Sequence, residues 1–140
     1  MQERNSTYSI QNANLGVENE VDRLKAQALM GWDKEFRNLK WLGLEDGMEV
    51  LELGSGPGYY TEQLVSNLPR SRVTALEIDS TLQEKARLIL TDVPESRLRF
   101  VQASIYDTGL PDNTYDFAVA RLLFLHLYHP LKLQRKSFVC

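Results

Sequence analysis

The sequence of 140 residues contains a single cysteine, Cys140 at its last position. One thiol excludes an intramolecular disulfide and a cysteine-rich zinc site. No apolar run approaches the roughly 20 residues that a helix needs to cross a bilayer. The first residues are polar and lack the apolar core of a signal peptide. These absences predict a cytoplasmic protein without a membrane partner.

A basic cluster is also missing. The formal net charge is −3, and lysine and arginine are not concentrated in any segment, so nucleic acid is not favoured as a partner. The length suits one domain. We predict a flexible N-terminal arm over residues 1–16, which are rich in asparagine, glutamine and serine, one folded domain over residues 17–130, and an atypical C-terminal tail over residues 131–140.

The most informative segment combines an apolar run, a glycine-rich turn and a helical pattern. Met48–Leu53 is predicted to be a buried strand, and Tyr59–Leu68 a helix. Between them, Gly54, Gly56 and Gly58 alternate with other residues. Glycines let the backbone turn sharply and let a ligand approach it closely. This arrangement is typical of a nucleotide-type site.

Two acidic residues narrow the choice of ligand. Glu52 lies two residues before Gly54, where a carboxylate repels a pyrophosphate and suits an ammonium or sulfonium group. Taken alone, Glu52 is equally well explained as a solvated residue at a strand end. Glu77 lies near the end of a second predicted strand, Arg72–Asp79, close to the roughly 20-residue spacing at which an acid meets ribose hydroxyls. Together the two acids favour a cationic nucleoside over a dinucleotide.

The chain resembles the class I S-adenosylmethionine-dependent methyltransferases, in particular their small-molecule group. The resemblance rests on the loop Glu52–Gly58, on Glu77, on a third predicted strand at Arg99–Ser104 and on the approach to a fourth at Pro111–Ala120. It implies an α/β fold: a Rossmann-like, doubly wound parallel sheet with strand order 3-2-1-4, here incomplete, preceded by N-terminal helices. It also implies S-adenosyl-L-methionine as the cofactor.

The resemblance further implies roles for individual residues. Glu52 is expected to hold the methionine ammonium group, Glu77 the ribose hydroxyls, and Ser104 with Ile105 the adenine. Serine departs from the family here, because an acid is common at the position of Ser104. The full set of expected cofactor-binding residues is Glu52, Gly54, Ser55, Gly56, Gly58, Glu77, Ile78, Ser104 and Ile105.

Two residues after the fourth predicted strand are candidates for catalysis. Arg121 is suited to pairing with a carboxylate, or else forms a structural ion pair. His126 is a candidate general base, because histidine as a residue type suits that role near neutral pH, and its alternative is a packing or capping role. No residue pattern indicates a metal site.

Helix boundaries are predicted from capping signals and periodicity. A helical pattern over Glu18–Leu42 is expected to break at Gly31, with Asn19 as the N-cap. Ser80 and Gln83 have the spacing of a capping box at the start of a later helix.

The chain ends before the remaining strands of the family's fold. We therefore expect either a truncated product or a domain that another chain completes, and self-association through the exposed apolar edge. Three functions stay open on the sequence. They are methyl transfer to a small-molecule acceptor, a non-catalytic cofactor-binding module that pairs with another chain, and an NAD- or FAD-dependent oxidoreductase. Glu52 and the glycine spacing disfavour the last.

Overall fold

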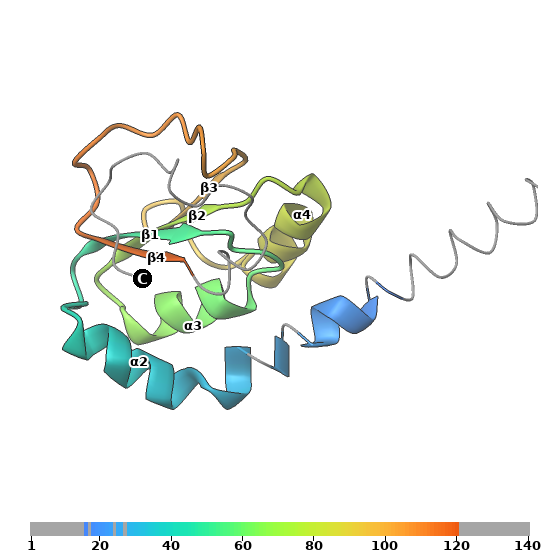
Figure 1. The fold of residues 1–140 in the computed structure, drawn as a ribbon, viewed down its shortest axis with the longest axis horizontal. Coiled ribbons are helices and arrows are strands. Elements are labelled where there is room, and N and C mark those ends of the chain that lie inside the picture. The colour runs from blue at the N-terminus through green and yellow to red at the C-terminus, as the bar shows by residue number, and fades with distance from the viewer. Residues whose placement is uncertain (1–15, 17, 24, 27, 121–140) are drawn as a thin grey trace, which may run out of the picture.

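The structure is a computed structural model that describes residues 16, 18–23, 25–26 and 28–120. A four-stranded parallel sheet with the order β3-β2-β1-β4 forms its centre (Figure 1). The predicted α/β fold and strand order are therefore confirmed. The elements in chain order are α2 (Trp32–Trp41), β1 (Glu49–Leu53), α3 (Tyr59–Asn67), β2 (Arg72–Leu76), α4 (Ser80–Ile89), β3 (Leu98–Val101) and β4 (Phe117–Ala120).

Strand β1 lies between β2 and β4 and is almost entirely buried. Its register places Glu52 opposite Ala75 of β2 and Val119 of β4. Because all four strands are parallel, their carboxyl ends meet at one edge of the sheet. Ligands of open α/β sheets bind beyond this edge, where the strand order reverses. Here that point lies at the end of β1.

Helices cover one face of the sheet. Helices α2 and α3 lie on the same side of the strands in Figure 1, and Ile89 of α4 and its C-cap residue Leu90 belong to the same apolar cluster. The buried sheet residues of this cluster are Val50, Val73, Ala75, Leu98, Phe117 and Val119, and those that share a strand alternate along it. Alternation is expected, because successive side chains of a strand point to opposite faces.

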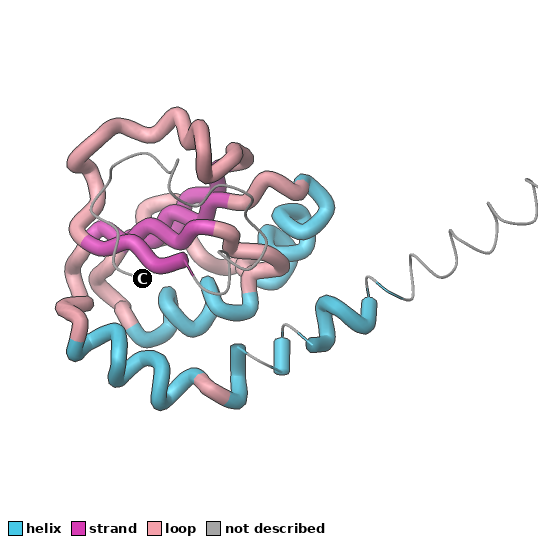
Figure 2. Tube along the Cα trace, in the orientation of Figure 1, coloured by secondary structure: helices cyan, strands magenta, loops and turns pink. Residues whose placement is uncertain are grey.

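The opposite face is covered differently. Between β3 and β4 the described chain forms no helix, and it runs as a loop over this face (Figure 2). Ile105 and Leu110 of the loop pack against Leu51, Leu53 and Leu76 of the strands. The 102–116 loop thus closes the second half of the core among the described residues.

Three boundary predictions need correction. Asn19 is not an N-cap, because residues 16 and 18 are already helical, although the predicted break at Gly31 is confirmed. The cap of α4 is Asp79 rather than Ser80, since the Asp79 carboxylate accepts from the N–H groups of Thr81 and Leu82. Strand β2 ends at Leu76 and does not continue to Asp79.

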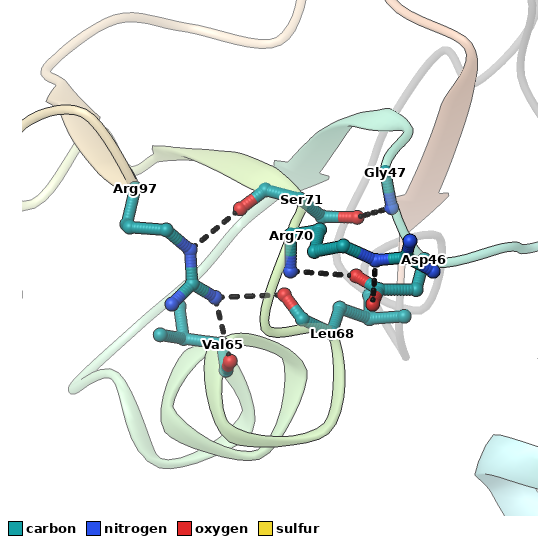
Figure 3. A network of polar contacts seen from close by, with 7 residues as sticks. All are labelled: Asp46, Gly47, Val65, Leu68, Arg70, Ser71 and Arg97. Carbon is teal, nitrogen blue, oxygen red and sulfur yellow. Dashed lines mark hydrogen bonds and ion pairs between the residues drawn. The ribbon is translucent and has the colours of Figure 1, made fainter.

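Arg97 ties the amino-terminal edge of the sheet to the end of α3 (Figure 3). Its guanidinium donates to the carbonyl oxygens of Val65 and Leu68 at 2.8 and 2.7 Å, and to that of Ser71 at 2.8 Å. The last carbonyls of a helix have no partner within the helix. A charged donor therefore satisfies them and fixes where α3 ends, at the sheet edge opposite the glycine loop.

Asp46 and Arg70 form an ion pair in the same region (Figure 3). Desolvation raises the pKa of Asp46, but the hydrogen bonds and positive charge of Arg70 together outweigh it, so the pKa lies below its ordinary value. The pair therefore adds stability above the unfolded pKa of an aspartate, and this contribution is lost as the pH falls through the lowered pKa. Its exposure to solvent keeps the contribution small.

Among the described residues, no helix is long and apolar enough to cross a bilayer. The cytoplasmic location stays a prediction.

Candidate functional site

The glycine turn between β1 and α3 depends on backbone conformations that other residues avoid. Gly54, Gly56 and Gly58 have φ angles of 73°, 58° and 93°. A side chain disfavours these positive values, whereas glycine adopts them readily. The three alternating glycines thus allow the chain to reverse between the end of β1 and the start of α3.

Hydrogen bonds within the protein engage the first N–H groups of this loop. The carbonyl oxygen of Leu76 accepts from the N–H groups of Gly54 and Ser55 at 2.8 and 3.0 Å. The carboxylate of Glu77 accepts from the N–H of Gly56 at 2.8 Å. The end of β2 and the residue after it therefore hold the loop.

The remaining loop positions offer no donor either. Pro57 has no N–H, and the N–H of Gly58 donates to the carbonyl oxygen of Ser55 at 3.3 Å. A pyrophosphate is normally bound by such loop N–H groups. In this structure the N–H groups within residues 54–58 are all engaged, so the loop itself offers no free N–H donor to a pyrophosphate.

Glu77 is held at the carboxyl end of β2 with 8% of its surface exposed. One carboxylate oxygen accepts from the N–H of Gly56, and the other accepts from the N–H of Asp79 at 2.9 Å. Each oxygen of an ionised carboxylate has room for a second hydrogen bond. The two backbone donors therefore orient Glu77 while leaving it able to accept from a diol.

Glu52 is buried, with 4% of its surface exposed, and points to the helical side of the sheet. Its carboxylate accepts a hydrogen bond from the hydroxyl of Thr61, in the first turn of α3. Sequence analysis assigned no role in the site to Thr61. One signal was available in the sequence: Thr61 is a polar residue on the helix face that Leu64 and Val65 make apolar, and a polar residue there needs a buried hydrogen-bond partner.

Close packing against α4 fixes the start of α3. A Cβ atom at Gly58 would lie 2.8 Å from the Cβ and 3.0 Å from the Cα of Ala86. Glycine at this position therefore permits the contact between the loop and α4 as well as the positive φ angle. The position of Thr61, three residues further on, depends on this contact.

The predicted adenine-binding residues lie after the carboxyl end of β3. The hydroxyl of Ser104 accepts from the N–H of Tyr106 at 3.2 Å, and the Ser104 carbonyl accepts from the N–H of Asp107 at 3.1 Å. Ile105 is buried in the core. Ile78, which follows Glu77, is 65% exposed.

Glu77 donates its N–H to the carbonyl of Val101 at 3.0 Å, which connects the ends of β2 and β3.

Two buried polar atoms have no hydrogen-bond partner among the described residues: the Ser55 hydroxyl and the Gln83 side-chain nitrogen. Buried polar groups are normally satisfied by protein, water or ligand. Ser55 lies within the glycine loop, so one of these atoms belongs to the site.

The chemistry of the site is that of hydrogen-bond acceptors and negative charge. Two buried carboxylates lie at the carboxyl edge of the sheet: Glu52 near the end of β1, and Glu77 directly after the neighbouring strand β2. This set fits a ligand that combines an ammonium group with a diol. No group of three potential metal-binding side chains occurs among the residues that the structure describes. Arg121 and His126 lie outside the described residues.

Comparison with known proteins identifies related sequences. A family model described as a methyltransferase domain matches residues 51–138. The curated malonyl-[acyl-carrier protein] O-methyltransferase of Paenibacillus sp. (strain JDR-2) is 30% identical over 84 residues, which cover 59% of this chain and 30% of that protein.

Solved structures share the fold. A SAM-dependent methyltransferase from Aquifex aeolicus has a TM-score of 0.67 and 26% identity, covering 81% of this chain and 61% of its own. A putative sarcosine dimethylglycine methyltransferase from Galdieria sulphuraria has a TM-score of 0.63 at 20% identity, covering 79% and 39%, and supports the fold alone. The chain thus spans less than two thirds of these relatives.

Proposed function

We propose, because this chain belongs to the methyltransferase domain family, that it takes part in methyl transfer from S-adenosyl-L-methionine to a small-molecule acceptor. The observation that carries the proposal is the complete engagement of the N–H groups of residues 54–58 within the protein. With two buried carboxylates beside it, the loop suits a cationic nucleoside and disfavours the pyrophosphate of NAD or FAD.

Each residue of the proposed site has a role that its contacts support. Glu52 attracts the ammonium group of the methionine part, and the Gly54–Gly58 backbone leaves room for it. Glu77, oriented by two backbone donors, accepts from the ribose hydroxyls. Ser104 has a second lone pair and a hydroxyl hydrogen for adenine. Ile105 contacts the adenine through its backbone, because its side chain is buried.

The methyl group of S-adenosylmethionine is activated by its attachment to a sulfonium. The protein's contribution is then to position the reactants, which can supply much of the rate acceleration.

Exposed Ile78 provides an apolar surface beside Glu77 for the adenine ring. Arg121 and His126 remain the proposed catalytic residues, as candidates for binding an acceptor carboxylate and removing a proton.

The first test is calorimetric titration of the 140-residue chain with S-adenosylhomocysteine, the product left after methyl transfer, and separately with NAD. We expect S-adenosylhomocysteine to bind and NAD to give no measurable heat. Binding of NAD in preference would overturn the proposal. Absence of S-adenosylhomocysteine binding by a folded sample would support a non-catalytic domain, which needs another chain to complete its site.

We also propose that this chain self-associates through the outer edge of β4. Among the described residues, β4 pairs with β1 on one side and with no strand on the other. An unpaired strand edge presents backbone donors and acceptors that invite pairing with a second chain. Sedimentation velocity is expected to show a sedimentation coefficient that rises with protein concentration, and a stable monomer at high concentration would contradict this proposal.

A further inference from the structure

Thr61 contacts the site through its side chain, and the roles proposed above for the glycine loop and the two acids do not include it. It is completely buried, and its hydroxyl donates to the carboxylate of Glu52. We infer that Thr61 is a positioning residue, which sets the affinity of the site for the amino-acid end of the ligand by orienting Glu52. This inference rests on the proposed function and adds a specificity determinant to it.

The single hydroxyl hydrogen of Thr61 is committed to Glu52. In helices, threonine hydroxyls often donate to a carbonyl of the preceding turn, and Thr91, two residues after the end of α4, donates in this way to Arg87 at 3.0 Å. Thr61 lies in the first turn of α3 and donates across to β1 instead. A hydroxyl has one hydrogen to give, so this bond fixes the direction of the Thr61 side chain.

Both partners are attached to rigid elements. Glu52 lies on the central strand, with neighbours on either side, and Thr61 lies between the core residues Tyr60 and Leu64. The branched side chain of threonine has a restricted χ1 angle. The packing of Gly58 against α4 sets the start of α3. The bond therefore holds the Glu52 carboxylate in one orientation relative to the glycine loop.

The chemistry of the donor also matters. A hydroxyl stabilises a carboxylate through a hydrogen bond but carries no positive charge. A lysine or arginine in its place would neutralise Glu52. With Thr61 as the donor, this hydrogen bond orients the carboxylate without placing a positive charge on it. Charge-assisted hydrogen bonds depend strongly on such alignment.

The test compares two ligands that differ only in the amino-acid end. S-adenosylhomocysteine carries the ammonium group, and 5′-methylthioadenosine keeps the adenine, ribose and thioether without it. Dissociation constants are measured calorimetrically for the full chain and for Thr61→Val, which has nearly the same shape and no hydroxyl. We expect Thr61→Val to raise the dissociation constant of S-adenosylhomocysteine about tenfold, a loss of about 1.4 kcal/mol of binding free energy. The dissociation constant of 5′-methylthioadenosine is expected to stay unchanged.

Three further variants separate positioning from a general structural role. Thr61→Ser retains the hydroxyl and is expected to restore the preference for S-adenosylhomocysteine. Thr91→Val removes a threonine hydroxyl elsewhere and is expected to change neither affinity. If Thr61→Val does not fold, Thr61→Cys replaces the hydroxyl by a weakly donating thiol and is expected to lower the preference in the same direction.

An unchanged preference in Thr61→Val, or in Thr61→Cys if the valine variant does not fold, would overturn the inference. Equal weakening of both ligands would also overturn it, because a structural defect does not distinguish them. Either result leaves the proposed function standing, since the unaltered chain still binds. Failure of the unaltered chain to bind either ligand would overturn the proposed function, and the inference with it.

Discussion

Replacement of Glu77 by alanine is expected to weaken the binding of S-adenosylhomocysteine at least about 100-fold. Hydrogen bonds to a charged group contribute about 1.5–3 kcal/mol each, and the ribose diol offers two donors to this carboxylate. Removal of both bonds thus corresponds to about 3 kcal/mol or more, with a tenfold change for each 1.4 kcal/mol. Calorimetric titration measures the effect directly.

Loss of Glu77 also leaves the N–H groups of Gly56 and Asp79 without their acceptor. Circular dichroism and thermal unfolding must therefore establish that Glu77→Ala is folded before its affinity is interpreted. Glu77→Gln keeps one oxygen acceptor. Its affinity for S-adenosylhomocysteine is expected to lie between those of the unaltered chain and Glu77→Ala. Glu84→Ala, which removes an exposed acid of α4, is the matched control and is expected to bind normally.

An affinity of Glu77→Ala within about threefold of the unaltered chain would contradict the assignment of Glu77 to the ribose, because about 3 kcal/mol of interaction would be unaccounted for.

The largest effect on folding is expected from Gly58→Ala. The new Cβ would lie 2.8 Å from the Cβ of Ala86 and 3.0 Å from its backbone Cα, and the residue would have to adopt a φ angle of 93°. Backbone atoms of α4 cannot rotate away as the end of a flexible side chain can. We expect the free energy of unfolding to fall by about 3 kcal/mol or more, measured by urea denaturation.

Gly109→Ala is the matched control for the backbone contribution. Gly109 also has a positive φ angle, 67°, but its Cβ would meet open space. The expected loss is then the conformational strain alone, about 1–2 kcal/mol. Equal losses in the two variants would show that the clash with Ala86 adds nothing to the cost of Gly58→Ala, and would contradict the prediction.

A second consequence of Gly58→Ala concerns the ligand. If the variant folds with α3 displaced, Thr61 moves away from Glu52, because it lies three positions after Gly58, in the first turn of the helix that Gly58 caps. Its affinity for S-adenosylhomocysteine is then expected to fall more than that for 5′-methylthioadenosine. The position of the third glycine thus affects stability and specificity through the same helix.

Much of the fold follows from local patterns in the sequence. The fourth strand, Phe117–Ala120, ends the predicted segment Pro111–Ala120, and β1 lies within the predicted Met48–Leu53. Short apolar runs separated by helical repeats indicate parallel strands with right-handed crossovers, because few other connections are compatible with the chain's handedness. The same logic placed Glu52 and Glu77 at neighbouring strand ends, where the structure has them.

Local patterns were less reliable at the ends of elements. Ser80 and Gln83 have the spacing of a capping box, but Asp79 caps α4. The N–H of Asp79 is held by Glu77, which places its carboxylate over the first turn of the helix. The bond between Glu77 and Asp79 is local, but the same carboxylate also accepts from the N–H of Gly56 in the loop after β1. The position of Glu77 at the start of α4 therefore depends partly on a contact between separate elements.

The sequence alone was sufficient for the sheet, the glycine turn and the two acids, because each depends on residue type and spacing along one stretch of chain. Only the tertiary structure shows which partners the site residues have. The engagement of the loop N–H groups by Leu76 and Glu77, and the bond from Thr61 to Glu52, join separate elements. Such contacts exist only after α3 and β2 have packed beside β1, and no spacing within a single segment encodes them.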